Sequence, residues 1–293
     1  SNEEIKDIYF QKFCDDDNIN LFNSKKFTCL DSNVNRAVEL STGKYVWIFG
    51  DDDLIVPGIL KKIKEFLYKE NPSLVVLNSM SFRNQDIIEE SRLPKCIKPI
   101  YGKKENDRFL IDLIGYLTYV GGILVDRDLW INNYDRSKIG SYFAHIDCIT
   151  SIKNNRNAHY FSEPAIKMRL GSQTWINKSF VIWHKSYPKI IWGLNNYNSQ
   201  AKIKVINPNP LNSIRAMLAS RSYGRLNFSN FKEFIFAEKN VSKNKKLVIF
   251  LIAIFPKFIL RFFYILFIIF MKKKHTINFS PKLALAQLKR DNN

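Results

Sequence analysis

The side chains best suited to chemistry follow a short apolar run at residues 45–49 and lie together at Asp51, Asp52 and Asp53. The aromatic and β-branched residues of that run predict a buried strand. In open α/β sheets, ligands bind at the carboxyl ends of strands, which is where these carboxylates fall. Three adjacent carboxylates repel one another, so a divalent cation, Mg²⁺ or Mn²⁺, is expected among them. The alternative is an acidic turn that merely caps a helix beginning at Pro57.

The elements that must position this motif alternate between helix and strand, which predicts an α/β layer with a largely parallel sheet. In the strand expected at residues 119–125, the pair Gly121-Gly122 permits the close approach of another backbone or of a ligand. The periodicity and cap residues predict helices at residues 31–40, 57–69, 107–115, 126–130 and 141–153, and strands at residues 44–49, 74–77, 119–125 and, interrupted by Pro164, 158–170.

The acidic motif and its neighbours closely resemble the sugar-nucleotide site of family-2 glycosyltransferases, which have the GT-A fold. The resemblance rests on Asn33, the run AVEL at 37–40, Gly43, the run YVWIFGDDD at 45–53, and Pro57-Gly58. The run YVWIFGDDD is most similar to the abequosyltransferase-like branch of this family, which builds O-antigen and capsule sugars. Weaker resemblance continues to about residue 175. It implies a Rossmann-like mixed sheet flanked by helices, and inverting transfer of a sugar from a nucleotide-sugar donor to a lipid-linked saccharide acceptor.

The resemblance also implies roles for single residues. Asp52 matches the last aspartate of the family's Asp-x-Asp motif and is expected to bind the metal, which would neutralise the diphosphate leaving group. The first aspartate of that motif falls on Gly50, a departure, and Asp51 is expected to contact the metal or the donor ribose instead. Asp53 is expected to orient the loop or to touch the donor sugar, and Asn33 is expected on the donor side.

An inverting transferase also needs a base for the acceptor hydroxyl, which the family supplies at the start of a later helix. The corresponding stretch makes Asp147 the first candidate and His145 the second. The alternatives are a charge at a helix start for Asp147 and a hydrogen-bonded structural histidine for His145. Arg169 and Trp175 follow a strand and are expected on the acceptor side, although Trp175 could simply pack.

The charge of the chain is concentrated in its second half. Residues 1–150 hold 20 basic against 23 acidic side chains, whereas residues 151–293 hold 25 against 4. Such asymmetry indicates a polyanionic partner, either nucleic acid or an anionic membrane surface. No helix-turn-helix, RNP or zinc signature appears, so nucleic acid is disfavoured. The four cysteines show no paired spacing, which argues against a disulfide scaffold and a structural zinc site.

Residues 247–271 are almost wholly apolar and are followed by three lysines. Their length allows a membrane span, but Pro256 and the charges of Lys257 and Arg261 favour a helix that lies in the membrane interface. A buried core helix is the third option. The expected organisation is a GT-A domain at residues 1–175, a basic helical region at 176–246, an apolar membrane-associated helix at 247–274 and a polar tail at 275–293. The protein is expected on the cytoplasmic face of a bacterial inner membrane.

The family's first strand, helix and second strand, which bind the nucleotide base, have no counterpart before residues 1–4. The sequence is therefore expected to lack a unit of roughly 35 residues, about one βαβ motif, and to bind nucleotide sugar poorly. Two other functions remain open from the sequence: a transferase-like membrane adaptor without activity, and a basic nucleic-acid-binding protein.

Overall fold

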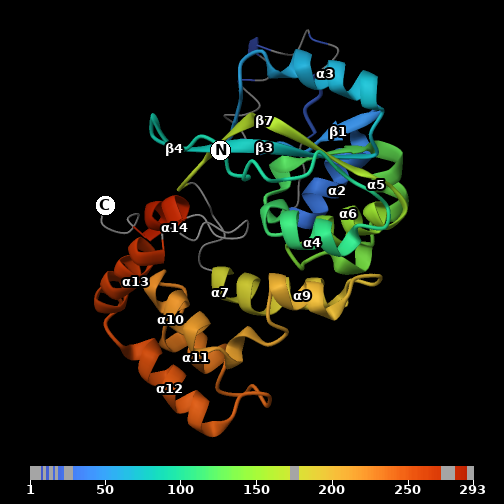
Figure 1. Ribbon diagram of the computed structural model, residues 1–293. Helices are drawn as coiled ribbons and strands as arrows, with labels where there is room; N and C mark the ends of the chain where they lie inside the picture. The colour runs from blue at the N-terminus through green and yellow to red at the C-terminus, as the bar shows by residue number, and fades with distance from the viewer. Residues whose placement is uncertain are drawn as a thin grey trace.

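The computed structural model describes residues 29–171, 178–271 and 281–288, together with residues 8, 11, 12, 16 and 19–22. A single sheet and its covering helices form the N-terminal part, and a group of helices follows (Figure 1). The helices are α2 (Leu30–Leu40), α3 (Ile59–Glu70), α4 (Asn106–Leu113), α5 (Arg127–Asn133), α6 (Ala144–Asn155), α7 (Ser179–Val181), α8 (Tyr187–Gly193), α9 (Ser199–Val205), α10 (Ile214–Ser222), α11 (Phe228–Phe234), α12 (Lys243–Ile254), α13 (Lys257–Met271) and α14 (Pro281–Leu288).

The sheet is mixed and has the strand order β1-β6-β3-β7-β2, with β4 paired to β3 and β5 paired to β7. Only β3 and β7 pair in parallel; every other described pair is antiparallel. The mixed α/β sheet is thus confirmed, but a largely parallel sheet is wrong, because β6 runs in the opposite direction between β1 and β3. The strands are β1 (Tyr45–Trp47), β2 (Leu54–Ile55), β3 (Leu74–Arg83), β4 (Asp86–Glu89), β5 (Ile100–Tyr101), β6 (Ile123–Asp126) and β7 (Ala158–Arg169).

Helices cover both faces of this sheet, as Figure 1 shows, with α3 on one face and α2, α4, α5 and α6 on the other. Ile59 and Ile63 of α3 are buried against Val75 and Leu77 of β3. The opposite face carries the larger core, in which Trp130 of α5 is fully buried. The central strand β3 accordingly reads as a continuous apolar run at its start, as expected for a strand covered on both faces.

Strand β7 continues through Pro164, where the sequence predicted an interruption. The register against β3 shifts between Leu77 and Ser79, so several residues around the proline lie opposite Asn78. The buried amide of Asn78 donates to the Ser162 carbonyl at 2.8 Å. This side-chain bond satisfies a backbone group in the irregular stretch, which explains how the strand tolerates a proline.

Asp31 joins two elements that are distant in the sequence. The sequence predicted that it caps its own helix, but α2 already begins at Leu30 and the Asp31 carboxylate is buried. It accepts hydrogen bonds from the backbone N–H groups of Gly140 and Tyr142, both at 2.9 Å, and of Ala144 at 3.3 Å. Asp31 therefore holds the start of α6, the helix that carries both candidate bases, against α2.

The C-terminal helices form a second apolar cluster, which includes Leu211, Met217, Phe231 and Ile249. The core of the sheet itself continues past the predicted boundary at residue 175, because Ile190, Ile191 and Ala201 of α8 and α9 belong to it. Phe180 of α7 already belongs to the second cluster, so the two clusters interleave between residues 180 and 211.

The apolar segment predicted as one helix at 247–274 is two helices, α12 and α13, which are bent by 100°. Pro256 lies at the bend, since proline has no backbone N–H and forces the preceding residue out of the helical conformation. In the described part of the chain no single helix meets the length and hydropathy expected of a membrane span, whereas the bent pair together does.

Candidate active site

The acidic loop, residues 50–53, leaves the end of β1 and is closed by its last carboxylate. Asp53 is 9% exposed and accepts a hydrogen bond from the Tyr119 hydroxyl at 2.5 Å. Its other oxygen accepts from the backbone N–H of Arg169 at 2.9 Å, at the end of β7. Asp53 therefore holds the loop against two distant segments.

Burial controls the ionisation of this pair. Burial raises the pKa of the Asp53 carboxyl, and the hydrogen bonds from Tyr119 and from the Arg169 backbone oppose that rise. Burial and the charge of Asp53 raise the pKa of the Tyr119 hydroxyl, which therefore stays protonated and donates. The contact between the two is a hydrogen bond from a neutral hydroxyl to a carboxylate at neutral pH.

Glycines allow the loop and its support to pack closely. A Cβ on Gly50 would lie 3.0 Å from an Asp52 carboxylate oxygen and 3.3 Å from one of Asp53. A Cβ on Gly121 would lie 2.5 Å from the Tyr119 ring, and one on Gly122 would lie 2.7 Å from the Tyr116 ring. The close approach predicted for the glycine pair is thus made by two tyrosine rings rather than by a backbone or a ligand.

The three carboxylates of the loop differ in their exposure. Asp51 is exposed and Asp52 is half-buried, whereas Asp53 is engaged by Tyr119 and Arg169. Among the described residues no group of three or more histidine, cysteine or acidic side chains is arranged to hold a metal ion. Asp51 and Asp52 offer the hard oxygen ligands that suit Mg²⁺ or Mn²⁺, and such an ion commonly completes its shell with substrate phosphates. The loop therefore fits a cation shared with a diphosphate.

Arg169, predicted on the acceptor side, lies against the acidic loop. Its side-chain Nε donates to the Asp52 carbonyl at 2.9 Å, and its guanidinium stacks over the Phe82 ring. Asn33 is exposed in the first turns of α2. Trp175, the second residue predicted on the acceptor side, lies outside the described residues. The structure thus brings Arg169 together with Asp52 and Asp53.

His145 is buried on α6 with 3% exposure. Its Nε2 lies 3.1 Å from the Leu117 carbonyl oxygen. Burial lowers the pKa of the imidazole to about 4, so the ring is neutral at physiological pH. A buried ring that is hydrogen-bonded to the backbone cannot reach an acceptor hydroxyl in this conformation, which favours the structural role over the catalytic one.

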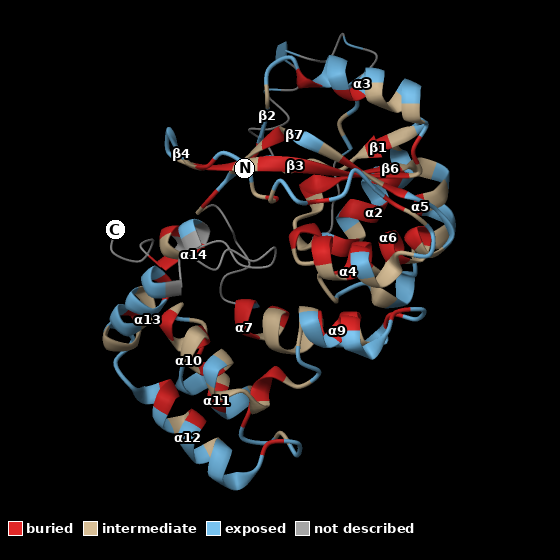
Figure 2. Cartoon of the chain, viewed as in Figure 1, coloured by how far each residue is buried: buried red, intermediate tan, exposed pale blue. Residues whose placement is uncertain are grey.

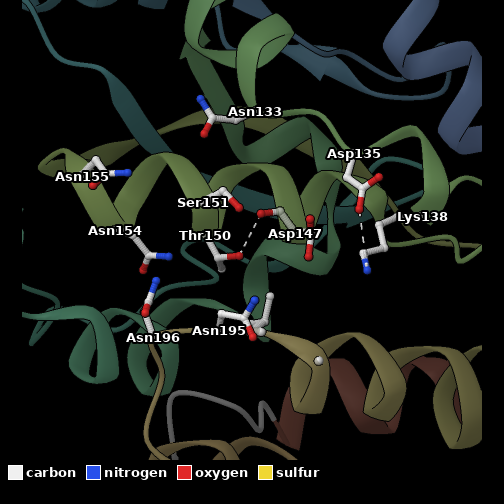
Figure 3. A pocket seen from close by; sticks show the side chains of 12 residues that line it. Asn133, Asp135, Lys138, Asp147, Thr150, Ser151, Asn154, Asn155, Asn195 and Asn196 are labelled. Carbon is white, nitrogen blue, oxygen red and sulfur yellow. Dashed lines mark hydrogen bonds and ion pairs between the residues drawn. The ribbon is translucent and has the colours of Figure 1, made fainter.

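Asp147 projects from another side of α6 into a polar cavity of about 340 Å³. Figure 3 shows this cavity between α6, the segment after α5 and the loop from α8 to α9. Burial raises the pKa of the Asp147 carboxyl, while the charge of Lys138 opposes the rise. Within the part of the chain that the structure describes, no hydrogen-bond donor is recorded for this carboxylate. Asp147 is therefore poised to accept one from a ligand.

Amides and hydroxyls make up most of the remaining wall of this cavity. Asn154 and Asn196 face each other across it in Figure 3. Asn196 adopts a left-handed backbone conformation with φ of 63°, which turns the α8–α9 loop back toward α6. No residue of the acidic loop lines the cavity, so the structure does not bring Asp147 and Asp52 together. The other polar residues that line it are Asn133, Asp135, Lys138, Thr150, Ser151, Asn155 and Asn195.

Tyr119 is the functional candidate that the sequence did not reveal. It contacts Asp53 across 66 positions of the chain, and no motif links the two. The neighbouring glycine pair was a signal of close packing, but it did not indicate which ring would fill the space.

Comparisons with known proteins show which proteins this chain is similar to. The model of the glycosyl transferase family 2 matches residues 2–122, which include the acidic loop and Tyr119. Abequosyltransferase RfbV of Salmonella typhimurium is 26% identical over 153 residues, which are 47% of this chain and 45% of that protein. The crystal structure of S. aureus TarS 1–349 in complex with UDP aligns with a TM-score of 0.44 and 13% identity, over 67% of this chain and 54% of that one.

The chain thus spans about half the length of each of these two proteins. The matched region of the family model contains the motif on which the resemblance was based, from Asn33 to Gly58. The resemblance to family-2 glycosyltransferases that the sequence indicated is therefore confirmed.

Proposed function

We propose that this protein transfers a sugar from a nucleotide-sugar donor to a saccharide acceptor, with inversion at the anomeric carbon. The observation that carries the proposal is the acidic loop, in which Tyr119 and the Arg169 backbone fix Asp53 and the neighbouring Asp51 is exposed to solvent. A loop that is fixed by one carboxylate and carries two further acidic side chains beside it suits a cation-bound diphosphate.

In this proposal Asp51 and Asp52 hold Mg²⁺ or Mn²⁺, which would act as a Lewis acid on the diphosphate leaving group. Asp53 fixes the loop, and Asn33 lies on the donor side. The Arg169 guanidinium already contacts the Asp52 carbonyl, so its charge lies beside the loop and favours an anionic donor.

The polar cavity around Asp147 is the proposed acceptor side. Saccharide hydroxyls both donate and accept hydrogen bonds, and the facing amides of Asn154 and Asn196 can do the same. Burial raises the pKa of the Asp147 carboxyl and makes it a better proton acceptor, but a base must also lie beside the donor, and no residue of the acidic loop lines this cavity. We further propose a lipid-linked acceptor of surface-polysaccharide synthesis at the cytoplasmic face of a bacterial inner membrane, in keeping with the abequosyltransferase among its relatives.

The donor side is tested by incubating the full chain with UDP-, GDP-, TDP- and CDP-linked sugars and measuring nucleoside diphosphate release. We expect release from one class of donor, loss with a chelator and recovery with Mn²⁺ or Mg²⁺. Asp52→Asn should lower the rate by roughly a hundredfold or more, in line with the loss of a group that acts on developing charge. Asp86→Asn, at the exposed first position of β4, is the matched control. Equal rates in both variants would overturn the proposed donor site.

The acceptor side is tested by separating transfer from acceptor-independent hydrolysis of the donor. If Asp147 is the base, Asp147→Asn lowers kcat for transfer and leaves hydrolysis unchanged. If the carboxylate only binds the saccharide, the same variant raises the acceptor KM at nearly constant kcat. Asn154→Ala, in the same cavity, should raise the acceptor KM in either case. Unchanged transfer kinetics in both variants would remove this cavity from the acceptor site.

A further inference from the structure

An apolar surface follows the outer sides of α12 and α13, and the chemistry proposed above does not use it. Its exposed positions recur every three or four residues, which makes a continuous stripe along each helix. Figure 2 shows exposed residues along both helices. The stripe consists of Leu247 (61% exposed), Leu251 (53%) and Ile254 (51%) on α12, and of Phe258 (70%), Phe262 (58%), Leu266 (37%) and Ile269 (49%) on α13, with Phe263 (61%) and Phe270 (83%) beside it.

The opposite side of α13 is anchored to the protein. The Arg261 side chain is only 8% exposed and donates from Nε to the Ser222 carbonyl of α10 at 3.1 Å. Ile268 is fully buried and packs with Ala284 and Leu288 of α14. The charge that the sequence placed in the middle of the apolar segment therefore points inward, and the phenylalanines point outward.

The bend between the helices is also fixed. Arg221 donates from Nε and Nη2 to the Phe255 carbonyl at 2.9 and 2.7 Å, next to Pro256. Phe255 itself is 43% exposed, so the apolar stripe continues across the bend from Ile254 to Phe258. The surface is thus one angular patch held in shape by the half-buried Arg221 and the buried Arg261, rather than two loose helices.

Basic side chains border this patch. Lys243, Lys245 and Lys257 are exposed at the starts of the two helices, and Arg215 of α10 stacks over the Phe267 ring. Residues 211–271 contain ten lysines and arginines against two glutamates. The apolar stripe suits the acyl chains of an anionic lipid surface, because it carries no hydrogen-bonding groups. The basic side chains at its border suit the phosphate headgroups.

We propose that α12 and α13 dock on an anionic lipid bilayer and lie in its interface, with the phenylalanine stripe among the acyl chains and the lysines at the headgroups. Contiguous exposed apolar surface marks an interaction site, and the exposed lysines beside it assign an anionic bilayer as its occupant. This surface stands apart from the acidic loop, so the proposal is independent of the proposed transfer reaction.

The test is flotation of the full chain with vesicles of phosphatidylglycerol and phosphatidylcholine, and with vesicles of phosphatidylcholine alone. We expect stronger binding to the anionic vesicles. Phe263→Asp should weaken binding to both by about ten- to a hundredfold, the equivalent of losing one buried phenylalanine. Replacing Lys243, Lys245 and Lys257 with glutamine should weaken binding by about fivefold per charge, on the anionic vesicles alone. Tyr68→Asp, at a position of α3 that is 93% exposed, is the matched control.

Circular dichroism and thermal unfolding check that each variant is folded. Because the substituted side chains are exposed, we expect the variants to fold. Equal loss in Phe263→Asp and Tyr68→Asp, or no binding of the unchanged chain to anionic vesicles, would overturn the proposal. A dimer in sedimentation that Phe263→Asp dissociates, without vesicle binding, would assign the patch to a second copy instead. Retention of the bound protein after alkaline carbonate extraction would contradict docking in the interface.

Discussion

Removal of the Tyr119 hydroxyl tests whether Asp53 governs the acidic loop. Tyr119→Phe keeps the ring that packs beside Gly121 but deletes the donor that lies 2.5 Å from the Asp53 carboxylate. One carboxylate oxygen then lies buried with no donor, which costs about 2 kcal/mol for a hydrogen bond to a charged group. If the loop opens to rehydrate that oxygen, the closed population falls by roughly 30-fold. We expect kcat/KM for donor hydrolysis to fall by a similar factor.

The matched control is Tyr116→Phe, which lies in the same cluster of rings. Its hydroxyl is 2.6 Å from the Leu77 carbonyl and 3.0 Å from the Ser79 hydroxyl, and it does not contact Asp53. Both variants should lose a similar free energy of unfolding in urea, but only Tyr119→Phe should lose activity. In that variant the pKa of Asp53, already raised by burial, rises further, so the acid limb of the pH–rate profile moves to higher pH. Equal activities in the two variants would refute the reasoning.

Three further predictions follow from buried contacts. Gly121→Ala places a Cβ 2.5 Å from the Tyr119 ring, so it should reproduce the activity loss of Tyr119→Phe in the same donor assay. Asp31→Ala leaves three backbone N–H groups at the start of α6 without their acceptor, so the free energy of unfolding in urea should fall by about 3 kcal/mol. The control is Asp128→Ala at an exposed position, which should lower the same free energy by less than about 0.5 kcal/mol. Burial lowers the pKa of His145 to about 4, so on acidification the unfolded chain takes up a proton at this residue before the folded chain does. The free energy of unfolding should therefore fall as the pH drops from 6.5 toward 4. In thermal unfolding, His145→Gln should show a weaker dependence of stability on pH over this range.

Local sequence was enough to predict the acidic loop, because an apolar strand and the carboxylates that follow it are adjacent in the chain. It also located the break at Pro256, since the missing backbone N–H acts at that residue whatever surrounds it. The helix and strand alternation predicted a layered α/β fold for the same reason. These features depend on neighbours within a few residues.

Strand direction was beyond such local signals. Whether β6 pairs antiparallel between β1 and β3 depends on how the chain returns through the turns at residues 116–122, and each strand alone looks the same in either direction. The extent of the sheet core was also hidden, because α8 and α9 lie beyond the region of strongest resemblance and yet pack on it.

The roles of individual charges were decided by the tertiary structure. Three neighbouring aspartates are equivalent in sequence, but Tyr119 and Arg169, 66 and 116 positions away, engage the buried Asp53, whereas Asp51 is exposed. Arg261 likewise appeared to place a charge inside an apolar segment, and only its bond to Ser222 shows that it points inward. The sequence thus determined which charged side chains this protein has and which helix, strand or loop carries each of them. Their burial and partners come from contacts between distant segments, because a buried charge is stable only where the fold supplies its hydrogen bonds.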